Sequence, residues 1–268
     1  MKRLILFLLL EISPCLQAVN NLRLPGIRCL GMGECGVTQS FLFNPAVINR
    51  LDDKSIDINY FNRYGLKELG TVGMALAYPN KLLSLGVDIS SFGYDQYRES
   101  RFRLSLGKQL DERWSLGLGI HYSILQTVLM NKQPQYLSTD IGILFSPVEK
   151  LLIGMLIMDC PSVPIQKSDI DIEDFTGYSL QIGFQWEVIN SMLIVAHVET
   201  NKRTVLTGSA GVEYRLYNHF YVRAGVKATP LLPTFGVGYN FLCFTADVAA
   251  LYHPVLGIST GIGLKYSF

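Results

Sequence analysis

The sequence is poor in charge and has no long apolar segment beyond its first residues. Only 17% of its 268 residues are charged and 49% are hydrophobic, whereas a typical soluble domain has about 25% charged residues. The net charge of +1 excludes a strongly basic surface for nucleic acid. After the N-terminus, no apolar run reaches the roughly 18 residues of a membrane-spanning helix. A membrane-like composition without such helices favours a closed β-barrel, the other structure that pairs every backbone group in lipid.

The sequence also lacks the residue patterns of catalysis and metal binding. Its histidines do not have metal-ligand spacing, no glycine-rich phosphate loop precedes a helix, and no serine–histidine pair on neighbouring strands is apparent. The segment Gly257 to Gly261 matches the nucleophile-elbow string, but that motif needs a following helix, and here the following residues alternate like a strand. We therefore expect a protein that is not an enzyme, with no catalytic residue, no metal and no cofactor.

Cysteine is scarce. Apart from Cys15 near the N-terminus, the chain has Cys29, Cys35, Cys160 and Cys243, and their spacing matches no zinc site. Cys29 and Cys35 are close enough in sequence to form a disulfide in an oxidising compartment. They could equally be two unpaired small residues in a glycine-rich turn, and the sequence leaves both possibilities open.

The N-terminus has the three parts of an export signal. Two basic residues precede the apolar run Leu4 to Leu10, and Ala18 provides a small residue for cleavage. We predict that residues 1–18 are a cleaved signal peptide. The apolar run is too short for a membrane anchor. A lipid anchor on Cys15 is the other alternative, which the preceding Pro14 disfavours.

From Lys54 onward, apolar residues alternate with small or polar ones. Trp114 to Ile124 is the clearest case, with Trp, Leu, Leu, Ile, Tyr and Ile on one face and Ser, Gly, Gly, His and Ser on the other. Period-two alternation indicates β-strands. The small-residue face would make a poor soluble surface, and aromatic residues near the ends of the apolar face are typical of lipid-facing girdles. We therefore expect the apolar face to contact lipid and the other face to line a lumen.

Such segments number about 14, and an even count places both ends of a barrel on the periplasmic side. We predict an all-β protein, a transmembrane antiparallel β-barrel of about 14 strands over residues 54–268. Longer connections are expected at Gln126 to Gln135 and at Asp159 to Phe175. Tight turns are expected around Pro79-Asn80, Asp111-Glu112, Ser146-Pro147, Val188-Ile189, Tyr217-Asn218 and Asn240-Phe241.

The last strand ends the chain on an aromatic residue. Leu264, Tyr266 and Phe268 share the apolar face, and this pattern looks like the signal read by barrel-assembly machinery. We therefore expect the exported protein to reside in the bacterial outer membrane, with membrane lipid and the barrel-assembly machinery as partners.

Residues 19–53 contain no convincing strand but are too apolar for a free tail. Asn44 is a possible helix N-cap followed by Pro45 at the first helical position, so we expect a short helix from Pro45 to Leu51. Phe41, Phe43, Val47 and Ile48 need an apolar partner, and the barrel interior is available. We predict that residues 19–53 form a plug segment inside the barrel.

This segment carries a family resemblance in Gly31-Met32-Gly33, Gly36-Val37 and Asn44-Pro45-Ala46. The pattern resembles the entry motif of the FadL and PorV/PorQ superfamily of outer-membrane barrels. The resemblance implies fourteen strands around an N-terminal plug. Glu34 and Cys35 depart from the pattern, which usually has a small residue there.

The two branches of this superfamily imply different functions. PorV-type members act in type IX secretion, and FadL-type members transport fatty acids through barrels with large extracellular insertions. This chain is short for the family, which favours the PorV/PorQ branch. We therefore predict a non-enzymatic binding or assembly component linked to protein export. The alternative is a FadL-like passive transporter, and the partner would then be a small hydrophobic molecule instead of exported proteins.

Alternation also predicts which ionisable side chains enter the lumen. These have two interpretations: a network that anchors the plug segment, or a polar pathway around it. Arg101 and Arg103 project from one strand and together could hold a carboxylate. The principal candidates are Asp88, Arg101, Arg103, His121, Asp140, Arg223 and Lys227, with His197, Glu199, Glu213, Asp247 and Lys265 beside them.

Overall fold

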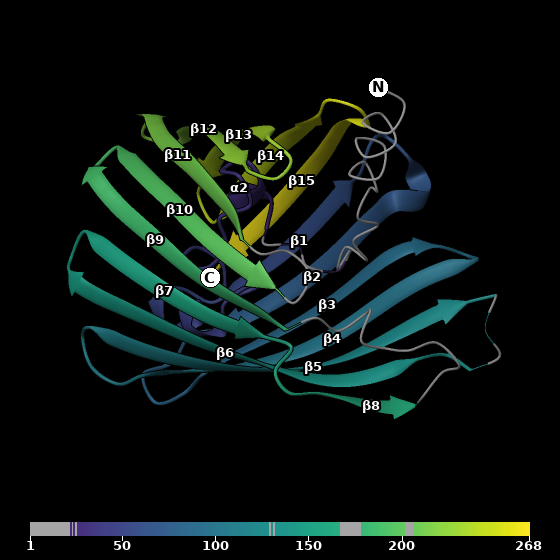
Figure 1. Ribbon diagram of the computed structural model, residues 1–268. Coiled ribbons are helices and arrows are strands. Elements are labelled where there is room, and N and C mark those ends of the chain that lie inside the picture. Colours follow the sequence, from purple (N-terminus) through teal and green to yellow (C-terminus); the bar gives the residue numbers. More distant parts are fainter. Residues whose placement is uncertain are drawn as a thin grey trace, which may run out of the picture.

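The protein is a closed antiparallel β-barrel (Figure 1). The computed structural model describes residues 22, 24, 26–128, 130, 132–166, 178–201 and 206–268, so the predicted signal peptide lies outside the described residues. Successive strands pair around the wall, with β7 pairing to β9, and the pairing of β1 with β15 closes the ring. Fourteen strands form the closed wall and β8 is an extra strand, which confirms the predicted fold.

The structure describes fifteen strands, β1 to β15. In chain order they are β1 (Ser55–Asn62), β2 (Gly70–Tyr78), β3 (Ser84–Tyr94), β4 (Tyr97–Gln109), β5 (Trp114–Thr127), β6 (Gln135–Val148), β7 (Leu151–Met158), β8 (Ser162–Gln166), β9 (Ser179–Ile189), β10 (Met192–Asn201), β11 (Thr207–Tyr217), β12 (Phe220–Lys227), β13 (Leu232–Phe241), β14 (Phe244–His253) and β15 (Gly257–Ser267).

The outer face of the wall is apolar and the inner face is small or polar. On β5, Leu116 and Leu118 are each 39% exposed, whereas Ser115 and His121 are buried. Trp114 stacks on Phe145 of β6 at a ring distance of 4.3 Å. An even-stranded barrel with an apolar exterior and aromatic residues near its rim is the form that outer-membrane barrels take.

The connections on the side of the two barrel ends are tight, but three predicted turns lie two residues early or more, inside strands: Ser146-Pro147 in β6, Val188-Ile189 in β9 and Asn240-Phe241 in β13. The chain does not turn at Ser146-Pro147, because β6 continues to Val148. Proline cannot donate to a strand ladder and is tolerated at a bulge, and the pairing of β6 with β7 shifts register between Phe145 and Val148. The turns at this side lie at residues 79–83, 110–113, 149–150, 190–191, 218–219 and 242–243.

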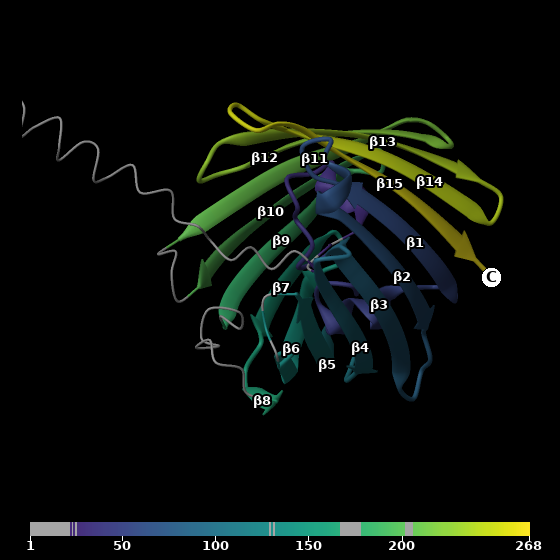
Figure 2. The same ribbon diagram turned by 90° about the vertical axis from the view of Figure 1, so that its right-hand side faces the viewer.

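One strand was not expected. β7 ends at Met158, and β8 then continues along β6 by pairing Ser162 with Ser138. β8 lies at the rim of the barrel beside β6 (Figure 2). The longest predicted loop, Asp159 to Phe175, therefore contains a strand in its first half, while residues 167–177 lie outside the described part of the chain.

The N-terminal segment lies inside the ring of strands (Figure 1). It contains a single helical turn, α2 (Ile27–Leu30), and a 3-10 helix, η1 (Pro45–Arg50). Asn44 caps η1 as predicted, since its side-chain oxygen accepts from the Ala46 N–H at 3.0 Å. A second 3-10 helix, η2 (Lys67–Leu69), lies in the β1–β2 loop. No helix of the described residues is long and apolar enough to cross a membrane.

Candidate functional site

The plug segment fits the wall through a series of inward-facing glycines. A Cβ atom on Gly211 of β11 would lie 2.5 Å from the Met32 carbonyl oxygen, well inside van der Waals contact. A Cβ atom on Gly117 of β5 would likewise collide with the backbone of Pro45 and Ala46. Because glycine has no side chain, the plug backbone can approach the wall backbone closely. The plug backbone comes equally close to Gly225, and plug side chains come comparably close to Gly107, Gly142, Gly183 and Gly261.

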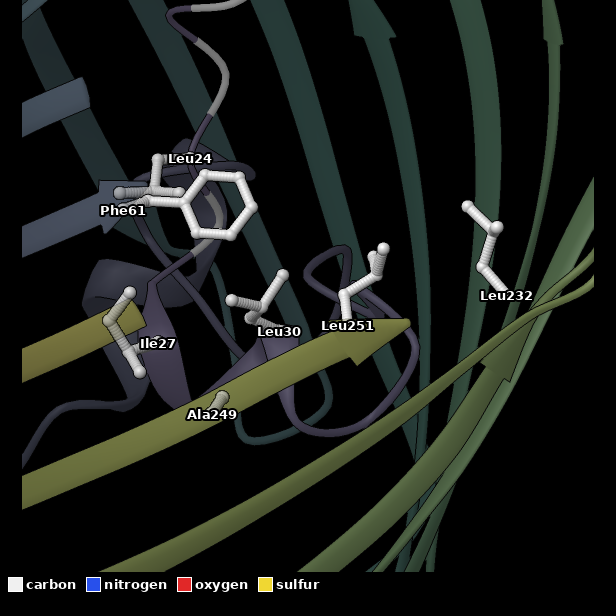
Figure 3. Close-up of a cluster of buried hydrophobic side chains, with 7 residues drawn as sticks. All are labelled: Leu24, Ile27, Leu30, Phe61, Leu232, Ala249 and Leu251. Atoms are coloured by element: carbon white, nitrogen blue, oxygen red, sulfur yellow. The ribbon is translucent and has the colours of Figure 1, made fainter. Parts of the chain in front are cut away.

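Apolar side chains complete this fit. In Figure 3, Ile27 and Leu30 of α2 lie with Leu24 among Phe61, Leu232, Ala249 and Leu251 from β1, β13 and β14. On the opposite wall, Val37 and Phe43 pack on Leu156 and Met158. The second contact explains why β7 is apolar on both faces: its outer face meets lipid and its inner face meets the plug.

The residues of the family-like motif hold the plug in shape. Met32 is fully buried, and Gly33 adopts a positive φ of 73° that favours glycine. The Gly33 N–H donates to Thr234 Oγ1 at 2.9 Å, and this hydroxyl donates to the Gly31 carbonyl at 3.2 Å. Asn44 donates to the Val37 carbonyl at 2.8 Å. The Gly36 carbonyl accepts from two backbone N–H groups, so these motif residues have structural contacts.

Glu34 and Cys35, which depart from the family pattern, both have defined surroundings. The Glu34 carboxylate accepts a short hydrogen bond from Lys227 of β12, so this departure ties the plug to the wall. Cys35 is buried beside Leu193 and Val195. Cys29 and Cys35 are both free, and burial raises the pKa of each thiol to about 12.

A second ionic tie joins α2 to β11, β12 and β14. Glu213 accepts from Arg28 at 2.7 and 2.8 Å and from Arg223 at 2.6 Å. Arg223 also reaches Asp247 at 2.6 Å. A side chain at Gly238 on the intervening β13 would lie 2.6 Å from both groups, so glycine there lets the arginine cross the strand.

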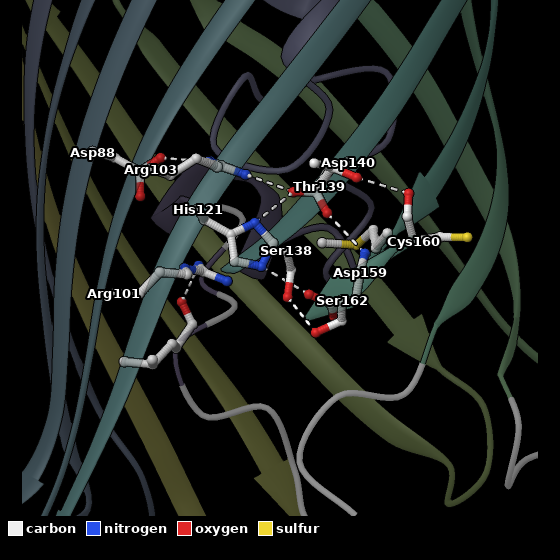
Figure 4. Close-up of polar contacts among 12 residues, drawn as sticks. Asp88, Arg101, Arg103, His121, Ser138, Thr139, Asp140, Asp159, Cys160 and Ser162 are labelled. Carbon is white, nitrogen blue, oxygen red and sulfur yellow. Dashed lines mark hydrogen bonds and ion pairs between the residues drawn. The ribbon is translucent and has the colours of Figure 1, made fainter. Parts of the chain in front are cut away.

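On the opposite wall, a cross-strand row of polar residues contacts the plug (Figure 4). Asp88, Arg103 and His121 occupy paired positions on β3, β4 and β5. Arg103 lies 2.6 Å from Asp88 Oδ1 and donates to the carbonyls of Phe41 and Leu42. The row thus connects the wall to the plug immediately before η1.

His121 continues this row toward two further carboxylates. Its Nε2 lies 2.8 Å from Asp159 Oδ1, and its Nδ1 lies 3.5 Å from Asp140 Oδ2. Ser138 is the cross-strand partner of His121, a serine–histidine adjacency that the sequence analysis missed. The two nitrogens nevertheless face carboxylates, and Ser138 Oγ pairs with Ser162 Oγ at 2.6 Å. This arrangement does not activate a serine nucleophile.

Arg101 and Arg103 do not converge on a common position for a carboxylate ligand. Arg101 donates to the Leu22 carbonyl at 2.6 Å, and Arg103 is held by Asp88. Sequence reasoning also missed Arg28, because it lies in the plug, and Asp159, because it lies between strands. Of the principal candidates, Asp88, Arg103, His121 and Asp140 come together, Arg101 lies beside them, and Arg223 and Lys227 hold the plug at the other wall.

Two cavities separate the plug from the wall on the side of the tight turns. One, of about 320 Å³, is bordered by Arg28, Asp57 and Lys265. The other, of about 450 Å³, is bordered by Arg50, Glu187 and Arg215. A much smaller space of about 20 Å³ lies among Leu22, Leu24, Leu42 and Arg101. The two larger cavities are lined by polar side chains, which include positively and negatively charged residues.

Comparisons with known proteins bear on the fold. No protein-family model and no curated protein matches this sequence. Among solved structures, the CymD monoaromatic hydrocarbon channel aligns with a TM-score of 0.64 and 15% identity, covering 92% of this chain and 98% of its own. The toluene transporter TodX of Pseudomonas putida aligns at 0.63 and 11%, covering 92% and 99%.

A FadL homologue of Pseudomonas aeruginosa aligns with a TM-score of 0.55 and 11% identity, covering 90% of this chain and 94% of its own. At these identities the likeness concerns the fold alone. It supports the FadL side of the resemblance seen in the plug motif, and none of the three structures is described as a secretion component. The chain has the barrel fold of the FadL-type channels.

Proposed function

We propose that the protein is a passive channel for small, uncharged hydrophobic compounds in a bacterial outer membrane. The observation that carries this proposal is the whole-chain likeness to CymD, described as a monoaromatic hydrocarbon channel. The apolar exterior suits a barrel in lipid. The plug packs against both walls, which supports selective passage of small solutes over free flow through a wide aqueous pore.

The charges of the lumen support an uncharged passenger. Arg28, Arg103, Arg223 and Lys227 each contact a carboxylate of the protein itself. At Arg103 and Arg223 a fatty-acid carboxylate would have to displace a buried partner, and breaking a buried ion pair is costly. A neutral aromatic or aliphatic compound has no such requirement. This reasoning favours hydrocarbons over fatty acids.

Uptake by whole cells tests the proposal. Cells that produce the protein should accumulate radiolabelled toluene faster than cells with an empty vector, while octanoate and a disaccharide enter both at equal rates. The amount of folded barrel should be checked by heat-modifiable migration. Equal toluene uptake in the two strains would overturn the channel proposal, and faster octanoate uptake would overturn the preference for neutral compounds.

The export-linked function predicted first from chain length makes a different prediction. Deleting the gene would then lower the amount of exported protein at the cell surface and leave hydrocarbon uptake unchanged. Measuring both quantities in one deletion strain separates the two functions.

A further inference from the structure

The strongest unexplained feature of the lumen is the buried group formed by His121, Asp140 and Asp159. They come from β5, β6 and the bulge between β7 and β8, residues 159–161, at which pairing along β6 is interrupted. All three are buried, at 4%, 0% and 6% exposure. One nitrogen or oxygen atom from each lies within 4.8 Å of the others. Neither the fold nor the proposed passage of neutral compounds requires this combination.

One nitrogen of the His121 imidazole contacts a carboxylate, an arrangement that metal-binding histidines share. Its Nε2 and Asp159 Oδ1 are 2.8 Å apart, so one ring nitrogen can donate to a carboxylate. Metal-binding histidines commonly donate their second ring N–H to a carboxylate or carbonyl, which leaves the other nitrogen unprotonated. In His121 that other nitrogen is Nδ1. Asp159 is itself fixed, since its N–H donates to Asp140 Oδ1 at 3.0 Å.

The atoms that face each other across this group have no hydrogen bond. Within the described part of the chain, neither His121 Nδ1 nor Asp140 Oδ2 has a hydrogen-bond partner, although both are buried. They lie 3.5 Å apart. Two ligands of a tetrahedral zinc ion with bonds of about 2.1 Å are separated by about 3.4 Å. The two atoms thus have the spacing of neighbouring metal ligands.

Charge also favours a cation at this position. Asp140 is fully buried, and a buried carboxylate requires a compensating charge. Arg103 Nη1 lies 3.8 Å from Asp140 Oδ2, but the guanidinium makes its close contact, 2.6 Å, with Asp88. Asp140 is therefore only partly compensated by Arg103.

We propose that His121 Nδ1 and Asp140 Oδ2 bind a divalent transition-metal ion of the zinc type, with Asp159 positioning the imidazole. A mixed nitrogen and oxygen ligand set suits zinc and its neighbours better than magnesium or calcium. The ion would join β5 and β6 and, through Asp159, the bulge before β8. This site does not depend on which compound the barrel transports.

Metal titration of the purified, folded barrel tests the proposal directly. After chelator treatment, Zn²⁺ should bind saturably at one ion per chain by elemental analysis, and Co²⁺ should give visible absorption bands that Zn²⁺ removes. His121→Phe and Asp140→Asn should abolish this binding. Asp159→Asn should weaken it by about 10–100-fold, as expected for loss of a residue that orients a ligand. His219→Asn, which removes an exposed imidazole from the β11–β12 turn, is the matched control and should change nothing.

The rival explanation is a doubly protonated His121 between two carboxylates, with no metal. Nitrogen NMR of labelled wild-type protein in Zn²⁺-containing buffer distinguishes the two: a metal-bound Nδ1 supports the site, and protons on both ring nitrogens overturn it. Absence of saturable binding, or equal binding by His121→Phe and wild type, also overturns it. If the variants fail to show heat-modifiable migration, the wild-type NMR and Co²⁺ spectra decide alone.

Discussion

At the scale of single residues, the charged side chains of the lumen form ion pairs with residues that are not their neighbours in the sequence. Arg223 contacts Glu213 on the next strand and Asp247 two strands away, and the second contact exists because position 238 lacks a side chain. Arg28 shares Glu213 with it from inside the plug. Arg223 and Glu213 join neighbouring strands, and Arg28 extends this group to the plug, so these charges tie the plug to the wall.

The cysteines provide a residue-scale prediction. Cys29 and Cys35 are buried in the plug, and burial raises the pKa of each to about 12, so neither carries appreciable thiolate at pH 7.5. Cys243 is exposed in the β13–β14 turn. We expect a maleimide to label Cys243 in the folded barrel and Cys29 and Cys35 only after denaturation. Mass spectrometry of labelled peptides checks this, and rapid native labelling of Cys29 would show a loosely held plug.

At the scale of elements, backbone contact between plug and wall is the feature that alternation cannot predict. Glycine on the inner face of a strand is equally compatible with an open lumen, so the sequence predicted a plug inside the barrel but not its close approach to these glycines. The structure places the plug backbone against Gly117, Gly211 and Gly225, and the Asn44 side chain against Gly142. The spacing of these glycines along the chain does not predict the contact, because the plug residues that they contact, within 26–51, are far away in the sequence.

Gly117→Ala tests this contact. The added methyl group would collide with the backbone of Pro45 and Ala46, and overpacking of this kind costs about 1–3 kcal/mol. Gly73→Ala on β2 is the matched control, because its Cβ would meet only the Ile89 carbonyl at 3.8 Å. We expect protease to cut the plug faster in Gly117→Ala than in wild type or Gly73→Ala. Equal cleavage in all three would mean that the plug does not need this close approach.

The outer face gives a second prediction at this scale. Leu118 lies mid-strand on β5 and faces outward. Arginine on the lipid face costs about 2–4 kcal/mol at the bilayer midplane. Leu118→Arg should therefore reduce the heat-modifiable fraction in outer membranes, whereas Leu118→Phe, which keeps an apolar side chain, should not. If both variants insert equally well, the residue does not contact lipid.

Turn chemistry explains where element boundaries were predictable. The β4–β5 turn carries Asp111, whose carboxylate caps two backbone N–H groups, and it was placed correctly. The β13–β14 turn is Leu242-Cys243, with Leu242 at a positive φ of 52°. Such turns usually contain glycine or asparagine. The residues of this turn are neither, and the turn was predicted two residues too early. β8 was missed because it pairs with β6 beyond a bulge.

At the scale of the whole molecule, the closed barrel was predictable from alternation and the candidate site was not. Strand pairing about a turn sets the register, so a turn placed near residues 111–112 predicts that Arg103 lies close to His121 across the hairpin. Asp159 belongs to no strand and reaches His121 only through the bulge after β7. The sequence therefore predicts that Arg103 and His121 lie close together. The position of Asp159 beside them follows only from the path of the chain after β7.

The plug determines the expected electrical behaviour of the intact barrel. In planar bilayers the wild type should show low single-channel conductance, since residues 26–51 pack against both walls. Deleting residues 19–53 should raise the conductance and admit small polar solutes, provided that heat-modifiable migration shows a folded barrel. Large, steady conductance of the wild type would contradict a closing role for this segment.

The glycine contacts also constrain the order of folding. The plug touches strands from β3 around to β15 with too little clearance for a methyl group at many positions. A finished barrel would have to admit side chains as large as Phe41 past these narrow places, and a rigid closed wall cannot do so. We expect the strands to assemble around the N-terminal segment, with the seam between β1 and β15 closing last. The segment would then act as a template for the circumference of the barrel during its biogenesis.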